Sequence, residues 1–179
     1  IPADLATEAG CATVEERLRD RRTPIDLLVN NAGIGLNKRF LASTLEDETR
    51  ILRLNVEAVM RLTFAVFLPQ MTERRSGGVI NVSSVAGFGV TAPGSTYTAT
   101  KAYVINFSES VGQSVRRHGV TVLALCPGFV RTEFHRRAGI PTEGSPGWIW
   151  LDADSVVGKA LSDLRKGRYV SVPTLRYKV

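Results

Sequence analysis

Three side chains that can move protons stand close together along the chain: Ser84, Tyr97 and Lys101. Tyr97 and Lys101 are four residues apart, which places both on one face of a helix, about one turn from each other. An ammonium group held near a phenol favours the phenolate, so the tyrosine can exchange a proton nearer neutral pH than its ordinary pKa of about 10 allows. A serine hydroxyl beside it can donate to an oxygen whose charge changes during a reaction. The pattern predicts acid-base chemistry at an oxygen atom.

Short apolar runs alternate with helical patterns along the rest of the chain, which predicts an α/β fold with a parallel sheet. The expected strands are Ile25 to Asn30, Val79 to Val82, Val120 to Leu125 and Tyr169 to Val172. The expected helices are Asp4 to about Arg21, Thr44 to about Arg75, Tyr97 to about Arg117, and Asp154 to Leu164. The first strand has a continuous apolar sequence, so we expect it to be buried. Each of the first three strands leads into a polar or turn-forming segment that could line a site.

These segments carry motifs that resemble the short-chain dehydrogenase/reductase family from about Asp4 to Thr132. They are N-N-A-G at residues 30–33, the serine that precedes Y-x-x-x-K, and P-G-x-x-x-T at residues 127–132. The resemblance implies a Rossmann-like, doubly wound parallel sheet in three layers, with the ligand beyond the carboxyl ends of the strands. It also implies an oxidoreductase that moves a hydride between the nicotinamide of NAD or NADP and a small-molecule carbonyl or secondary alcohol substrate.

One family motif does not occur in this sequence. The family opens with a strand and a glycine-rich turn, T-G-x-x-x-G-x-G, which receives the cofactor pyrophosphate at a helix N-terminus. Gly33-Ile34-Gly35 has a different spacing and follows a different strand, whereas Asp4-Leu5-Ala6 resembles the end of the family's third strand. We therefore expect residues 1–179 to be a single, partial NAD(P)-binding Rossmann domain that lacks the first strands, and the natural protein to be longer.

The resemblance assigns four residues to catalysis. Tyr97 would be the acid-base group, and Lys101 would lower its pKa and hydrogen-bond the nicotinamide ribose. Ser84 stands thirteen residues before Tyr97, the family's usual spacing, and would hold the substrate oxygen; its neighbour Ser83 is the alternative. Asn55 would hold a water that links the lysine to solvent. From its residue type alone, Asn55 is a buried amide that satisfies a backbone group inside a helix.

The resemblance also implies contacts with the cofactor. Besides Tyr97 and Lys101, the implied residues are Asp4, Asn30, Ala32, Gly33, Pro127, Gly128, Val130 and Thr132. Glycine lets a flat ligand approach the backbone closely. The backbone of Val130 would face the nicotinamide carboxamide, and Thr132 would lie near the phosphates. Asp4 either contacts the adenine or caps the N-terminus of the first helix.

Residues 133–151 are rich in turn formers and aromatic residues, and the family places its substrate loop here. Trp148 and Trp150 could form the wall of an apolar pocket or anchor the loop on the sheet. His135 could contact the substrate, whereas His118 has the place of a cation at a helix C-terminus. The segment Gly89 to Ser95 should form the rim of the substrate site opposite this loop.

Composition restricts the class of protein. The chain has 179 residues, a hydrophobic fraction of 44% and a net charge of +6, with basic clusters near residues 17–22, 131–137 and 165–168. The middle cluster could attract an anionic substrate or the cofactor phosphates. No aromatic residues alternate with the first cluster, so we expect no nucleic-acid binding. No apolar run reaches the ~18 residues of a membrane span, and two cysteines make neither a disulfide framework nor a metal site, so we expect a cytoplasmic protein.

Two other functions stay open from the sequence. One is a truncated, catalytically inactive paralogue that acts as a binding or oligomerisation module. The family forms its subunit interface with the helices that correspond to residues 44–75 and 97–117, so we expect a homodimer or homotetramer. The other is a family member with a different reaction, such as a dehydratase or an epimerase.

Overall fold

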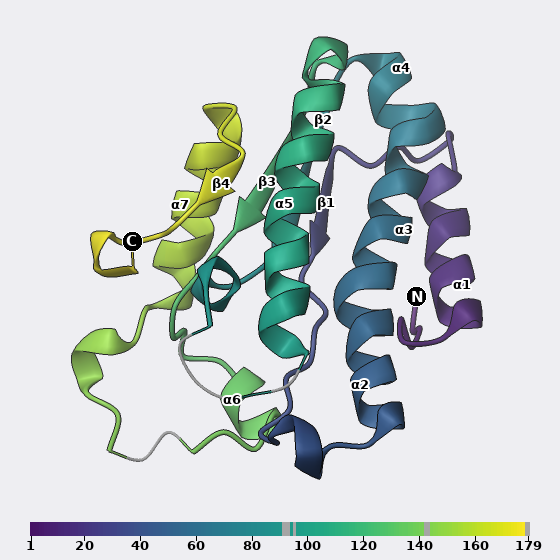
Figure 1. Ribbon diagram of the computed structural model, residues 1–179. Coiled ribbons are helices and arrows are strands. Elements are labelled where there is room, and N and C mark those ends of the chain that lie inside the picture. Colours follow the sequence, from purple (N-terminus) through teal and green to yellow (C-terminus); the bar gives the residue numbers. More distant parts are fainter. Residues whose placement is uncertain (91–93, 95, 142–143, 178–179) are drawn as a thin grey trace.

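The chain folds around a parallel sheet, and the computed structural model describes residues 1–90, 94, 96–141 and 144–177. The strands are β1 (Leu27–Asn30), β2 (Gly77–Val82), β3 (Val120–Leu125) and β4 (Val170–Ser171). They lie in the order β1-β2-β3-β4, and each neighbouring pair is parallel (Figure 1). Parallel strands present their carboxyl ends at one edge, so the segments that follow β1, β2 and β3 meet there.

The helices begin and end close to the expected positions. Their bounds are α1 (Glu8–Arg19), α2 (Leu45–Leu52), α3 (Ala58–Val66), α4 (Thr72–Arg74), α5 (Tyr97–Val115), α6 (Phe134–Arg137) and α7 (Ala153–Arg165). The expected long helix over residues 44–75 is formed by α2, α3 and α4 with two π-helical segments between them, Arg53–Glu57 and Phe67–Met71. Thr44 caps its N-terminus, because its hydroxyl accepts a hydrogen bond from the amide of Asp47 at 3.2 Å.

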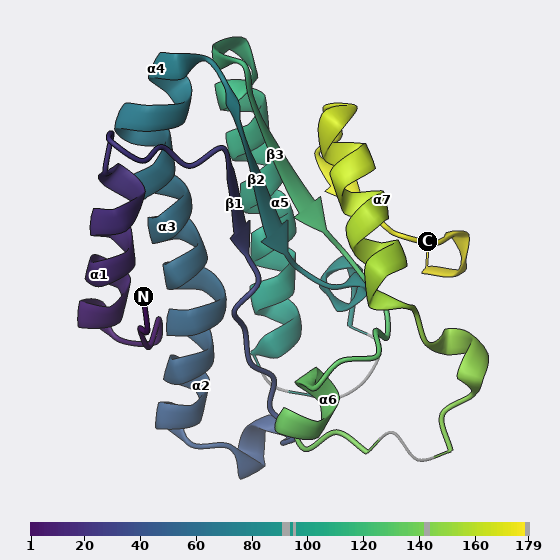
Figure 2. The ribbon, with the colours of Figure 1, turned by 180° about the vertical axis from the view of Figure 1, so that it is seen from behind.

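Helices cover both faces of the sheet. α5 packs on β3, α3 packs on β1 and α1 packs on α3, whereas α7 packs on β2 and β3 from the opposite side. Figure 1 shows α5 in front of the sheet, and Figure 2, seen from behind, shows α7 in front. The predicted three-layer, Rossmann-like parallel fold is confirmed.

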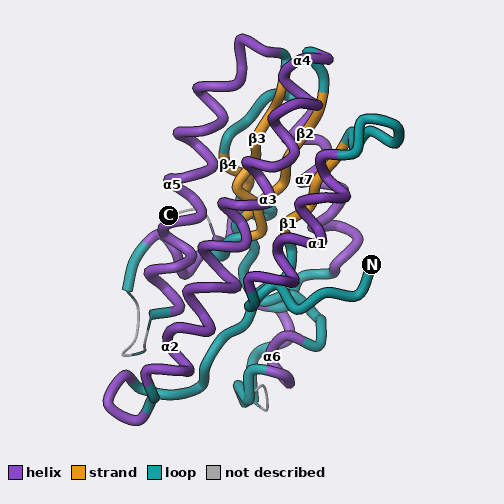
Figure 3. Tube along the Cα trace, turned by 90° about the vertical axis from the view of Figure 1, so that its right-hand side faces the viewer, coloured by secondary structure: helices purple, strands orange, loops and turns teal. Residues whose placement is uncertain are grey.

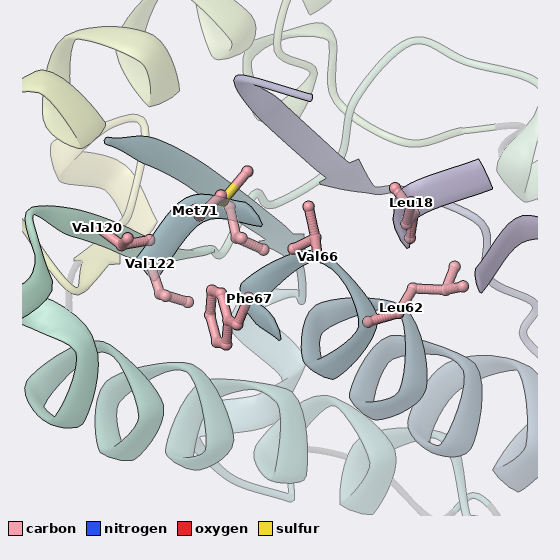
Figure 4. Packing of buried hydrophobic residues seen from close by; sticks show 9 residues of the cluster. Leu18, Leu62, Val66, Phe67, Met71, Val120 and Val122 are labelled. Atoms are coloured by element: carbon pink, nitrogen blue, oxygen red, sulfur yellow. The ribbon is translucent and has the colours of Figure 1, made fainter. Parts of the chain in front are cut away.

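Successive side chains of β2 and β3 point to opposite faces of the sheet, as the period of a strand requires, and so belong to two hydrophobic clusters. Val79 and Val122 are partners in the β2–β3 register and are fully buried under α1 and α3. Leu18, Leu62, Val66, Phe67, Met71 and Val120 complete this cluster with Ala65 (Figure 4). The next register pair, Ile80 and Leu123, points to the other face and packs against α7.

The loop between β3 and α7 lies beyond the carboxyl ends of the strands. α6 belongs to this loop and lies at the same end of the molecule as the start of α2 (Figure 3). A parallel bridge joins Val130 to Leu151 and fixes both ends of the loop next to each other. The sequence did not predict α6, which is only one turn long.

Two expectations were wrong. Thr7, not Asp4, caps α1, because its hydroxyl accepts a hydrogen bond from the amide of Gly10 at 3.1 Å. β1 is only partly buried, since Leu27 is 39% exposed and Val29 is 49% exposed. These two side chains point away from α3, the helix that covers the other face of β1.

None of the helices among the described residues is long and apolar enough to cross a membrane.

Candidate active site

The ends of β2 and β3 bring Ser84 next to the segment that begins at Pro127. The amide of Ser83 donates to the carbonyl of Leu125 at 2.7 Å, and the amide of Val85 donates to the carbonyl of Pro127 at 3.0 Å. The pairing of the two strands therefore continues past their ends. α5 begins at Tyr97 and packs against this edge, so its first two turns face the same place.

Lys101 lies almost completely inside the protein, with 7% of its surface exposed. Its Nζ atom donates to the carbonyl of Val82 at 3.0 Å and lies 5.6 Å from the centroid of the Tyr97 ring. Burial disfavours the ammonium form and lowers the pKa of Lys101 to about 8. Its buried neighbour Cys126 is uncharged at neutral pH, because burial raises the pKa of that thiol to about 12.

The pKa of Tyr97 differs from the expectation. Burial raises it above the ordinary value, and a hydrogen bond with the side chain of Ser84 only partly opposes this effect. The sequence predicted that Lys101 would lower this pKa. The ammonium of Lys101 lies over the face of the tyrosine ring, and burial is the largest cause of the shift.

The two adjacent serines have different partners. The hydroxyl of Ser83 is buried and donates to the carbonyl of Lys101 at 2.7 Å, so it ties β2 to α5. The hydroxyl of Ser84 accepts a hydrogen bond from the amide of Ala86 at 3.1 Å, and the side chain of Ser84 acts to lower the pKa of Tyr97. This geometry favours Ser84 over Ser83 as the serine that acts with the tyrosine.

Asn55 is buried in the first π-helical segment, Arg53–Glu57. Its Oδ1 atom accepts from the amide of Ile34 at 2.9 Å, and its Nδ2 atom donates to the carbonyl of Ile34 at 2.8 Å. Nδ2 also lies 3.3 Å from the hydroxyl of Thr100, which donates to the carbonyl of Tyr97 at 2.6 Å. The expectation that Asn55 satisfies backbone groups is confirmed. Asn55 therefore connects the loop after β1 to the helix that carries Tyr97.

Gly33 lies directly beside this group. A methyl group added to its Cα would lie 3.3 Å from Oδ1 of Asn55 and 3.6 Å from Nζ of Lys101. The backbone of Gly33 therefore lies close to both side chains. Asn30, by contrast, points into the core, where its Nδ2 atom donates to Thr63 at 3.0 Å and to Asn81 at 2.8 Å. Its amide ties β1 to α3 and β2, whereas the neighbouring Ala32 is exposed.

The segment after β3 forms the other side of the site. A methyl group added to Gly128 would come within 2.2 Å of the Tyr177 ring, whose hydroxyl donates to the carbonyl of Ile149 at 2.7 Å. Val130 lies in the bridge to the loop's far end. The hydroxyl of Thr132 accepts a hydrogen bond from the amide of Phe134 at 3.3 Å.

Other predicted residues lie elsewhere. The Asp4 carboxylate accepts from the amide of Ala6 at 3.0 Å and forms an ion pair with Arg50 at 3.4 Å, both outside the group around Tyr97. His118 lies in the last turn of a short helix that follows α5, as predicted. Thr91 to Pro93, together with Ser95, lie outside the described residues. The described residues contain no group of three or more His, Cys, Asp and Glu side chains placed to hold a metal ion.

The positive charge of the basic cluster at residues 131–137 is partly neutralised. Glu133 accepts hydrogen bonds from Arg136, at 2.7 Å, and from Arg137. Arg131 lies over the ring of Trp150, with 5.8 Å between its guanidinium carbon and the ring centroid. Its charge is therefore held next to an aromatic face.

Sequence reasoning missed Phe134, Tyr177 and Thr100. Phe134 lies in the predicted loop, but only the structure shows that its ring centroid is 6.1 Å from that of Tyr97. Tyr177 lies far along the chain from Gly128, and no local pattern connects them. Thr100 did have a signal, because it lies one turn after Tyr97 and one residue before Lys101.

The fold and these motifs recur in known proteins. The short chain dehydrogenase family model matches residues 1–140. The chain is 36% identical over 133 residues to oxidoreductase UcpA of Escherichia coli, a match that covers 74% of this chain and 50% of that protein. It is 37% identical over 135 residues to a 3-oxoacyl-[acyl-carrier-protein] reductase of Synechocystis, with 72% of this chain and 54% of that protein covered.

Solved structures of short-chain dehydrogenases have a similar fold. A short-chain dehydrogenase from Sphingobium yanoikuyae in complex with NADPH matches with a TM-score of 0.88 and 36% identity, over 97% of this chain and 66% of that one. A bulky-bulky ketone specific alcohol dehydrogenase from Comamonas testosteroni matches with a TM-score of 0.84 and 31% identity, over 98% of this chain and 65% of that one. The chain spans about half the length of the curated relatives it matches. It belongs to the short-chain dehydrogenase family.

Proposed function

We propose that the protein is an NAD(P)-dependent oxidoreductase that moves a hydride between the nicotinamide and the carbon of a carbonyl or secondary alcohol. The observation that carries this proposal is the meeting of Ser84, Tyr97 and Lys101 at one edge of the sheet, with the backbone of Gly33 beside the lysine. The family and the NADPH-bound structural neighbour support it.

The residues present fit the nicotinamide and ribose half of such a cofactor. Gly33 lies beside Nζ of Lys101, which is a donor that a ribose hydroxyl can accept from. Ala32, and the segment with Pro127, Val130 and Thr132, would line the nicotinamide side. NAD or NADP, when bound, supplies or accepts the hydride.

Tyr97 would supply the proton. Because burial raises its pKa, the phenol form dominates at neutral pH, and this is the form that can donate to a carbonyl oxygen. The hydroxyl of Ser84 would hold that oxygen beside the phenol. Lys101 would orient the cofactor, and Asn55 would hold a water that links the lysine to solvent. In the oxidative direction the same groups would take the proton from the alcohol.

A second candidate is an oligomerisation module, and exposed apolar side chains on two helices favour it. Met60 and Phe64 of α3 are 42% and 63% exposed, and Tyr103 of α5 is 36% exposed. In an enzyme these faces would form a homodimer or homotetramer interface, so they do not exclude catalysis. The catalytic group at the sheet edge makes the oxidoreductase the better supported function.

The test is the variant Tyr97→Phe in the natural polypeptide, with Tyr103→Phe as the matched control on the same helix. Tyr97→Phe should lower ketone-dependent NADPH oxidation by about 10²–10⁴-fold, because it removes the proton donor. NADPH binding, followed by cofactor fluorescence, should change little. Turnover at the parental rate in Tyr97→Phe would refute the proposed role, and no NADPH binding in the parent would favour the oligomerisation module.

A further inference from the structure

Four aromatic side chains form a connected group next to Tyr97, which we call the aromatic wall: Phe129, Phe134, His135 and Trp150. The ring of Phe134 lies 6.1 Å from that of Tyr97, measured between centroids. The ring of His135 lies 5.5 Å from Phe134 and perpendicular to it. The wall therefore begins at the proposed acid-base group.

The rest of the wall is a three-ring group. His135 stacks on Phe129 at 5.2 Å, with 13° between the ring planes, and lies 5.1 Å from Trp150. Phe129 and Trp150 meet edge to face at 5.5 Å. The amide of Leu151 donates to the carbonyl of Phe129 at 2.7 Å, so the backbone holds both ends of the wall together. Such mutual contacts fix the rings before any ligand arrives.

α6 places the wall across from the loop that follows β1. A methyl group added to Gly35 would lie 3.2 Å from Phe134 and 3.7 Å from Tyr97, so these two rings meet at the glycine. Nδ2 of Asn37 donates to the carbonyl of Gly139 at 2.7 Å and joins this loop to the end of α6. The wall is thus attached to both sides of the site.

The wall is mostly apolar, but it includes the imidazole of His135. Burial lowers the pKa of His135, so the imidazole is neutral at pH 7. Its Nδ1 atom is buried and has no hydrogen-bond partner among the described residues. Phe129 is 38% exposed, and Trp150 lines a hollow of about 280 Å³ together with Arg131, Ser145 and Gly147. A ligand can therefore still reach Phe129 and Trp150.

We infer that the substrate is an aromatic ketone, or the corresponding secondary alcohol, whose ring packs against the aromatic wall while its oxygen meets Tyr97 and Ser84. This inference rests on the proposed function. Ring-to-ring contacts add stabilisation beyond the apolar area they bury, and a small aliphatic ketone cannot obtain it. The wall would thus select for an aromatic ring rather than for bulk alone.

The experiment compares kcat/KM of the natural polypeptide for three ketones, with NADPH and NADH tested in turn. Acetophenone carries an aromatic ring, cyclohexyl methyl ketone has similar bulk without aromaticity, and butanone is small. We expect kcat/KM for acetophenone to exceed that for butanone by at least about tenfold, which corresponds to 1.4 kcal/mol. We also expect it to exceed that for cyclohexyl methyl ketone.

The variant Phe134→Leu assigns this preference to the wall, and Phe64→Leu on α3 is the control. In Phe134→Leu the preference for acetophenone over cyclohexyl methyl ketone should disappear, whereas Phe64→Leu should keep it. Because both ketones are assayed on one preparation, their ratio does not depend on the fraction of folded enzyme. Trp150→Leu provides a second, independent change in the same wall.

The outcomes separate the two claims. Butanone used as well as acetophenone, or an aromatic preference that survives in both wall variants, would overturn the inference and leave the oxidoreductase function intact. A parent that binds NADPH and reduces none of the three ketones would also overturn the inference, whereas a parent that binds neither NADPH nor NADH would contradict the oxidoreductase function itself.

Discussion

Lys101 carries a cost in stability that its position next to the proposed cofactor site explains. Its pKa is lowered to about 8 by burial, while an unfolded chain keeps a lysine pKa near 10.4. Between these two values the unfolded state binds more protons than the folded state. The free energy of unfolding should therefore rise with pH across this window, by up to about 3 kcal/mol.

This gives a test by substitution. In Lys101→Met the rise in the free energy of unfolding between about pH 8 and 10.5 should be absent. At pH 7 the variant should be more stable than the parent, although the lost hydrogen bond to Val82 reduces this gain by about 1 kcal/mol. Urea unfolding at several pH values measures both effects. The exposed Lys166→Met is the control and should keep the parental pH profile. An unchanged profile in Lys101→Met would show that the lysine is not buried as described.

At the residue scale the sequence predicted more of the placement than of the electrostatics. The four-residue spacing placed Tyr97 and Lys101 on one helical face, because spacing and helical period determine this. The direction of the pKa shift of Tyr97 was predicted wrongly, since it depends on burial by distant segments such as the one with Phe134. The role of Ser83 as a tie to α5 was likewise a tertiary fact that no local pattern reveals.

At the scale of elements, the C-terminal segment supports the turn after β3. The ring of Tyr177 lies where a side chain on Gly128 would have to be, and the tyrosine hydroxyl connects to Ile149. Gly128→Ala should therefore displace Tyr177 and lower both the melting temperature and NADPH affinity. The double variant Gly128→Ala/Tyr177→Ser should be less impaired than the sum of the two single variants, because the clash is gone. Strict additivity, measured by thermal unfolding, would contradict the contact.

The order and type of the main elements followed from apolar periodicity, but several details did not. The π-helical segment at Asn55 has the residue pattern of an ordinary helix, and only its backbone distinguishes it. α6 is a single turn inside a segment rich in turn formers, so no periodicity could predict it. The partial exposure of β1 depends on which helices cover the sheet, which the apolar run Leu27 to Val29 does not encode.

At the scale of the whole molecule, β1 has one apolar face that the described helices leave partly open. Leu27 and Val29 are partly exposed at the end of the described sheet, and such an edge promotes self-association. The 179-residue chain studied alone should therefore self-associate, and Val29→Thr should reduce this. Val157→Thr on α7, with 54% exposure, is the matched control. Light scattering over a concentration series measures the effect, and equal association in all three chains would locate the contact elsewhere.

The most direct measurement of the central claim follows the hydride itself. NADPH carrying deuterium at C4, in each of its two stereochemical forms, is incubated with the natural polypeptide and acetophenone. The proposed function predicts that one of the two forms yields 1-phenylethanol with one deuterium at the carbinol carbon, and that Tyr97→Phe yields almost none. Alcohol without deuterium from either form, or no alcohol from the parent despite bound NADPH, would contradict the account.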